Sequence, residues 1–149
     1  MANTLHEIAQ EIFEDEFIDH DDVTQAGIKM WLRNNLGTLN IFIDTDFEII
    51  DEIVSPVLKY EEKAILKEMY LERYYHKIAR SSLKGALSAA TTEWIIIKEG
   101  DTTFTRANKN ELVKSLRGFA NDHRDAKEYL IRRYNAYQTH PIEVNIKSS

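Results

Sequence analysis

The sequence contains no cysteine, and it has only two prolines and five glycines among its 149 residues. Without cysteine, disulfide bridges, thiolate zinc sites and cysteine nucleophiles are excluded. The small number of glycines and prolines leaves little material for the many turns of a β-sandwich or barrel. The composition therefore favours a helical protein.

Long apolar runs are also missing. The N-terminal stretch MANTLHEIAQEIFEDEF is acidic and amphipathic, so it lacks the basic start and apolar stretch of a signal peptide. No run approaches the roughly 18 apolar residues that a membrane span requires. A net charge of −6 argues against general binding to nucleic acid. We therefore expect a single domain over residues 1–149, made in a cytoplasm and without a membrane partner.

Apolar residues that recur every three or four positions predict two helices in the first part of the chain. The first helix covers residues 4–18, with Asn3 or Thr4 as its N-cap. Asp21 or Asp22 is expected to cap the second helix, because a negative charge suits that end of the helix dipole.

The second helix is expected to end at Gly37, a residue suited to the left-handed conformation after a helix. Trp31 and Leu36 lie on its apolar face. Beyond the glycine the apolar residues alternate, which is typical of extended chain. We therefore predict that residues 38–46 are extended and contact another element, whereas residues 47–54 fit a strand and a helical turn equally well.

The strongest helical pattern runs from about Val57 to Ala90, with Ser55 as its cap and Pro56 in its first turn. A helix of about 34 residues would be roughly 50 Å long. Because a small core does not need that length, part of it should serve contacts between subunits. The candidate residues for this subunit interface are Tyr70, Tyr74 and Tyr75.

The remaining segments differ in character. Residues 94–105 suggest a short hairpin or packed loop, and Asn108 with Glu111 suggests the cap of a last helix over residues 109–137. Pro141 should end this helix, so that residues 141–149 form an extended C-terminal tail. The predicted fold class is mainly α: a small helical bundle with one long central helix, a short β-hairpin or extended insertions, and that tail.

No combination of residues predicts a catalytic, cofactor or metal site. His20 beside Asp21 is better interpreted as a solvated turn, since a metal needs several converging ligands. Glu68, Glu72 and His76 are spaced four apart and fit a salt-bridged surface. The tyrosines of the two long helices invite a base-stacking interpretation, but the acidic total favours packing or a protein interface. An enzyme, for example a hydrolase, is the minority hypothesis.

Several short motifs, taken in order, resemble those of the small head-tail connector, or neck, proteins of tailed bacteriophages. These are WLRNNLGTLN, a Phe-containing acidic segment, EEKAILKEMYLERYYHKIAR, EGDTTFTR with NKNE, and YNAYQTHP. The resemblance covers about residues 26 to 141, and the order of the motifs carries it.

This resemblance implies a non-enzymatic virion structural protein without a cofactor. It would assemble in the host cytoplasm into a homo-oligomeric ring, with twelve subunits as the expected number, at the virion neck. The ring would join the portal protein to tail or stopper proteins and extend the channel through which double-stranded DNA passes without sequence-specific binding. The alternative is a small helical protein-binding or regulatory module. The tail residues expected to contact the portal or a neighbour are Pro141, Ile142, Val144 and Ile146.

Overall fold

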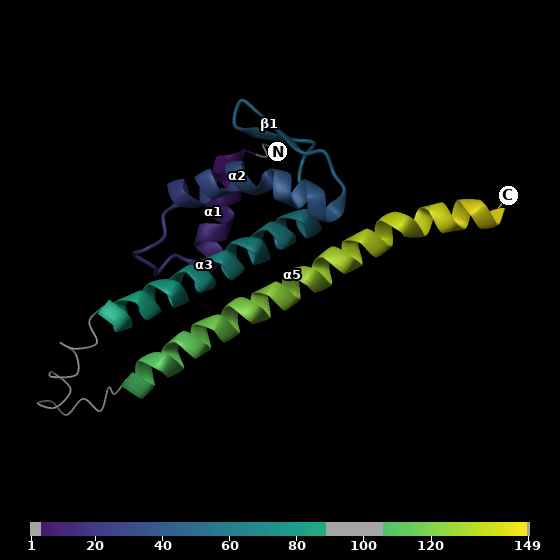
Figure 1. Ribbon diagram of the computed structural model, residues 1–149. Coiled ribbons are helices and arrows are strands. Elements are labelled where there is room, and N and C mark those ends of the chain that lie inside the picture. Colours follow the sequence, from purple (N-terminus) through teal and green to yellow (C-terminus); the bar gives the residue numbers. More distant parts are fainter. Residues whose placement is uncertain (1–3, 89–105, 149) are drawn as a thin grey trace, which may run out of the picture. The chain divides into compact units, whose positions relative to one another are not determined.

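The computed structural model describes residues 4–88 and 106–148. The mainly α fold is confirmed for these residues, and a small two-stranded hairpin accompanies the helices (Figure 1). Two compact units divide the chain: unit 1 comprises Met1–Tyr70 and Ala126–Ser149, and unit 2 comprises Leu71–Asp125. The elements are α1 (Leu5–Glu16), α2 (Gln25–Ile43), β1 (Glu48–Ile50), β2 (Ile53–Ser55), α3 (Tyr60–Ser88) and α5 (Arg106–Ser148).

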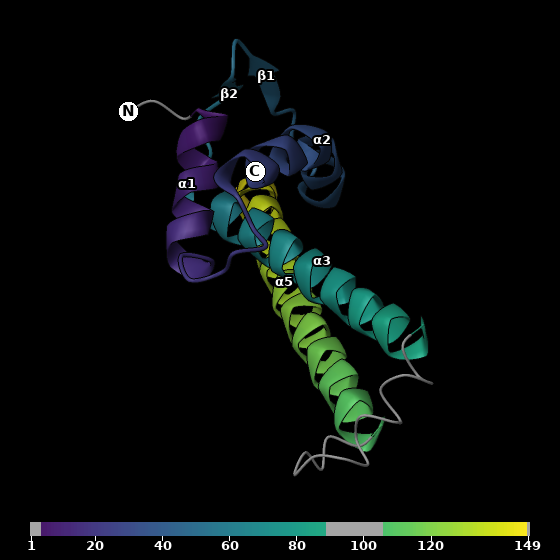
Figure 2. The same ribbon diagram turned by 90° about the vertical axis from the view of Figure 1, so that its left-hand side faces the viewer.

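The first helix, α1, is capped by Thr4, one of the two residues that the sequence suggests, and the cap is a capping box. The backbone N–H of Glu7 donates to the Thr4 hydroxyl oxygen at 3.1 Å, and the backbone N–H of Thr4 donates to the Glu7 carboxylate at 3.2 Å. These two bonds satisfy N–H groups that a helix start leaves unpaired. The apolar stripe of α1 is buried and packs against α2 (Figures 1 and 2); its buried residues are Leu5, Ile8, Ala9 and Ile12.

The second helix, α2, begins later than predicted. Its N-cap is Thr24, whose hydroxyl oxygen accepts from the backbone N–H of Gly27 at 3.0 Å. The prediction of Asp21 or Asp22 as the cap is therefore wrong. Those aspartates lie in the turn before the helix, and a later residue with the same capping chemistry takes their place.

The predicted end of α2 at Gly37 is also wrong, because the helix continues to Ile43 and closes at Asp44 in the left-handed conformation (φ 53°). Leu39 and Ile43 are buried at the next helical positions after Leu36. The expected extended segment over residues 38–46 is thus helical through residue 43. The apparent alternation arose from an apolar residue on the opposite side, Ile41, whose side chain is 81% exposed.

Replacing Gly37 with alanine should raise the free energy of unfolding by about 0.5–1 kcal/mol, because alanine has the higher helix propensity. Gly37 has no positive φ, and a Cβ atom there would meet no other atom within 4 Å. Urea denaturation followed by circular dichroism measures the change. As a control, Gly27→Ala should gain less, since its Cβ would lie 3.1 Å from the Thr24 hydroxyl oxygen. A loss of stability in Gly37→Ala would indicate a left-handed residue at the end of the helix.

The sequence pattern of residues 47–54 did not distinguish a strand from a helical turn. The structure shows that the chain after α2 forms a hairpin there. β1 pairs antiparallel with β2, and the turn residues Asp51 and Glu52 both have positive φ, 52° and 67°. This conformation matches the right-handed twist of a two-residue hairpin. The hairpin predicted over residues 94–105 lies outside the described residues.

The start of α3 differs from the prediction of a cap at Ser55. Ser55 is the last residue of β2, and the helix begins at Tyr60. The backbone N–H of Lys59 donates to the Glu62 carboxylate at 2.6 Å, so a side chain within the first turn caps this start. α3 ends at Ser88, close to the predicted Ala90, which lies outside the described residues.

The last helix, α5, is longer than predicted. Asn108 lies within it and is therefore not its cap. At the other end the helix continues through Pro141 to Ser148, where the sequence predicts an extended tail from residue 141. Proline inside a helix removes one backbone hydrogen bond and costs about 3 kcal/mol, and none of the described contacts of α5 accounts for this end of the helix.

Candidate protein-interaction site

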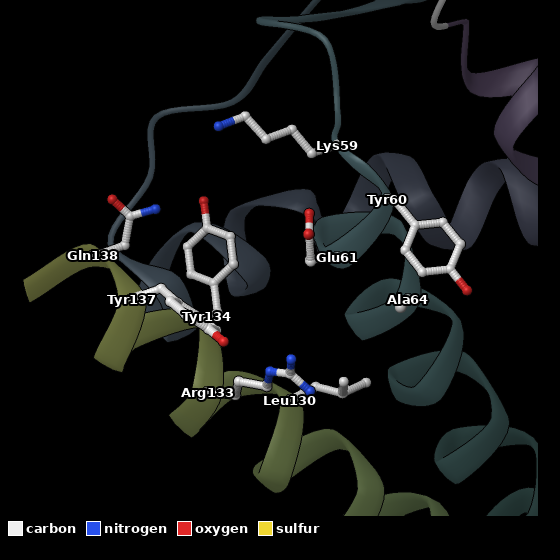
Figure 3. Close-up of a pocket in the computed structure, with 9 residues that line it drawn as sticks. All are labelled: Lys59, Tyr60, Glu61, Ala64, Leu130, Arg133, Tyr134, Tyr137 and Gln138. Atoms are coloured by element: carbon white, nitrogen blue, oxygen red, sulfur yellow. The ribbon is translucent and has the colours of Figure 1, made fainter. Parts of the chain in front are cut away.

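Unit 1 contains a groove between the start of α3 and the segment of α5 that belongs to the same unit. We call it the α3–α5 groove; its volume is about 530 Å³. Figure 3 shows its lining side chains, which come from two stretches of sequence far apart in the chain. They are Lys59, Tyr60, Glu61, Ala64, Leu130, Arg133, Tyr134, Tyr137 and Gln138.

A buried carboxylate joins the two sides of this groove. Glu62 is only 3% exposed, and its second carboxylate oxygen accepts from the Tyr134 hydroxyl at 2.5 Å. Its first oxygen accepts from the backbone N–H of Lys59. A buried charge needs such partners, because an unpaired one is costly. The pair therefore fixes α5 to the first turn of α3.

The Tyr134 hydroxyl is held in its neutral form by this environment. Burial, followed by the hydrogen bond and the negative charge of Glu62, raises the pKa of Tyr134 from 10.0 to about 12. A phenolate at this position would face a carboxylate in a partly dry site. The hydroxyl thus acts as a hydrogen-bond donor at neutral pH and does not offer an acid or base near the pH of ordinary catalysis.

The rim of the groove is aromatic and cationic. Tyr60 is 84% exposed, Tyr137 is 62% exposed, and the guanidinium of Arg133 lies 5.6 Å from the centre of the Tyr137 ring. Hydrogen bonds to the hydroxyls of Tyr137 and Tyr129 raise the pKa of Arg133 above its ordinary value, and the contact with Tyr137 has the larger effect. Arg133 therefore stays charged. Tyrosine and arginine are the residue types most enriched at the energetic centres of protein interfaces.

Two further contacts position α5 in unit 1. The side-chain amide of Asn135 donates to the backbone carbonyl of Phe42 at 3.2 Å, and the ammonium of Lys127 lies 5.4 Å from the centre of the Phe42 ring. Both contacts involve the last turn of α2. Residues 38–43 of α2, which the sequence pattern predicts to be extended, thus help to support the groove.

The predicted subunit-interface tyrosines are not gathered into one exposed patch. Tyr70 is 5% exposed and packs edge to face against Phe17 and Trp31, at ring distances of 5.5 and 5.2 Å. Tyr74 is buried, and the half-buried Tyr75 stacks on the His123 ring at 5.5 Å. Their role in subunit contacts stays a prediction, but Tyr70 and Tyr74 expose little surface for it.

The predicted tail contacts lie beyond the described side chains. Pro141, Ile142, Val144 and Ile146 belong to the helical end of α5, for which the backbone alone is described. The sequence pattern does not predict Tyr60 and Glu62 as site residues, because a helix capped by Ser55 would place both beyond its first turn. The available signal was a glutamate three residues after Lys59, which is the spacing of a capping contact.

Two histidine side chains lie close to carboxylates of the same segment. His20 lies 3.7 Å from Asp22 in the turn after α1, and His76 lies 3.9 Å from Glu72 on one face of α3. Among residues 4–82 and 111–138, whose side chains the structure describes, no group of three or more His, Asp or Glu side chains is placed to hold a metal ion. These pairs therefore suggest no site for metal chemistry.

Comparisons with protein-family models, curated proteins and solved structures give no match for this chain. Among the described helices, none has both the length and the apolar composition that crossing a membrane requires. A functional assignment for this protein thus depends on the residues and geometry described above.

Proposed function

We propose that this chain is a non-enzymatic structural protein of a tailed-phage virion. It forms a ring, with twelve subunits expected, between the portal and the tail or stopper proteins, and the ring extends the DNA channel. The order of the motifs in residues 26 to 141 supports this function. The observation that carries it is the α3–α5 groove, because exposed tyrosines beside an arginine fit a protein partner.

The length of the helices also supports a protein that makes contacts with other subunits. α3 has 29 residues and α5 has 43. Average helices in globular domains are about 11 or 12 residues long. Helices of this length present more surface than one small unit can cover, and the surplus suits an assembly.

The location of the protein can be tested directly. Mass spectrometry of purified virions from the phage that encodes the chain should detect it in a fixed ratio to the portal protein. Its absence from intact particles would contradict the proposal. That result would favour the alternative, a small helical protein-binding or regulatory module, for which affinity purification from the host should yield one stable partner.

Removing residues 141–149 should abolish binding to the portal protein without unfolding the rest of the chain. The contacts that hold α5 to unit 1 involve residues 127, 134 and 135, all of which the shortened chain retains. A pull-down with portal protein measures binding, and circular dichroism checks the helices. If the shortened and full chains bind the portal equally well, the tail does not make this contact.

A further inference from the structure

The charges of the chain are strongly separated along the sequence. Residues 1–58 contain 13 acidic and 2 basic residues, whereas residues 59–149 contain 12 acidic and 17 basic residues. Residues 34–58 contain no lysine or arginine at all. The hairpin lies in the acidic part, and the α3–α5 groove lies in the part with excess positive charge. The hairpin and the groove therefore come from parts of the sequence that differ in net charge.

The outer face of the hairpin is largely apolar and carries one carboxylate. Ile50 and Ile53 are directly opposite each other in the antiparallel pair and are 56% and 46% exposed. Glu48 lies on the same face as Ile50, two residues earlier in β1, and is also exposed. This outer face thus combines an exposed isoleucine pair with a neighbouring carboxylate.

The α3–α5 groove has the complementary arrangement. The groove is lined by the exposed rings of Tyr60 and Tyr137, by the cations of Lys59 and Arg133, and by one carboxylate, Glu61. The two cations outnumber this single carboxylate. Aromatic rings in a groove can cover an isoleucine pair, and a guanidinium or ammonium group can meet a carboxylate. The 46–56% exposure of the two isoleucines shows that their own chain leaves much of them uncovered.

We infer that the outer face of the hairpin of one copy docks into the α3–α5 groove of a second copy. This inference rests on the proposed ring function and deepens it by naming the two surfaces in contact. The contact joins two different patches, so it is heterologous, and repeating it produces a ring when the rotation closes. The isoleucine pair occupies the aromatic rim, and Glu48 faces Arg133.

Analytical ultracentrifugation of the full chain, up to about 0.5 mM, tests the contact. The native chain should associate reversibly. Glu48→Lys and Arg133→Glu should each weaken association about tenfold or more, because each places like charges against one another. The double variant E48K/R133E should regain association to within about threefold of the native chain, because it restores an opposite-charge pair. An equimolar mixture of the two single variants should also associate.

Matched controls separate this contact from a general effect of charge. Asp19→Lys and Arg117→Glu make the same charge changes at exposed positions outside both surfaces, and they should leave association unchanged. Ile50→Ser should weaken association, while Ile18→Ser, at a 66% exposed position in the turn after α1, should not.

Three results would overturn the inference: a native chain that stays monomeric throughout, single variants that behave like their controls, or a double variant as weak as the singles. None of these results affects the detection of the protein in virions, so the docking contact and the proposed function are tested separately.

Discussion

Replacing Tyr70 with alanine should lower the free energy of unfolding by about 3–5 kcal/mol, the usual cost of removing a large aromatic side chain from a core. Tyr70 is 5% exposed and makes edge-to-face contacts with Phe17 and Trp31. Each such ring pair adds about 0.5–1.5 kcal/mol beyond the burial of its area. Urea denaturation at constant pH, followed by circular dichroism, measures the loss.

Milder variants at the same position keep this prediction testable if the alanine variant does not fold. Tyr70→Phe keeps both ring contacts and should cost only about 1 kcal/mol. Tyr70→Leu should fall between the two. If Tyr70→Ala were as stable as the native chain but failed to associate, the residue would serve a subunit interface, as the sequence alone predicts, and not the core of unit 1.

The elements that could be predicted from sequence are those specified by neighbouring residues. The cap at Thr4 and the stripe of α1 follow from spacing within a single helix, and both are present in the structure. The end of α2 could not be predicted in this way. A glycine within a helix costs about 1 kcal/mol, whereas burying Leu39 and Ile43 stabilises by about 1.5–3 kcal/mol each. The larger effect depends on tertiary packing, which the sequence pattern does not show.

The position of the hairpin could not be predicted for a related reason. Asp51 and Glu52 occupy left-handed positions that usually favour glycine or asparagine, so the sequence has no turn signal there. Contacts from other elements hold Glu52 in place. Its backbone carbonyl accepts from the N–H of Leu5 at 2.9 Å, and its carboxylate forms ion pairs with Lys29, at 2.8 Å, and with Arg33. These partners are distant in sequence.

The candidate site could be predicted least of all, because it depends on a pairing between residues 72 positions apart. Spacing along α5 predicts that Tyr134 and Tyr137 lie on its apolar stripe. It cannot predict that one of them donates to a buried glutamate while the other stays exposed. That difference arises only when α5 packs against the start of α3.

Replacing Tyr134 with phenylalanine should lower the free energy of unfolding by about 2 kcal/mol, because the Glu62 carboxylate loses a hydrogen-bond donor while it remains buried. Tyr129→Phe, which changes an exposed tyrosine of the same helix, is the matched control and should have little effect. A double-mutant cycle with Glu62→Gln should show a coupling of about 1–2 kcal/mol. Additive effects would mean that the two side chains do not interact.

The pH dependence of this pair has a definite sign. The pKa of Tyr134 is about 12 in the folded chain and 10.0 without the fold, so the folded state favours the protonated hydroxyl. Its contribution to stability is fully present below pH 10 and is lost as the pH rises through about 12. The stability difference between the native chain and Tyr134→Phe should therefore stay constant up to about pH 10 and then shrink. Other tyrosines and lysines titrate equally in both proteins, so the stability difference between them reports on Tyr134 alone. A stability difference that stays constant up to about pH 12 would contradict the hydrogen bond to Glu62.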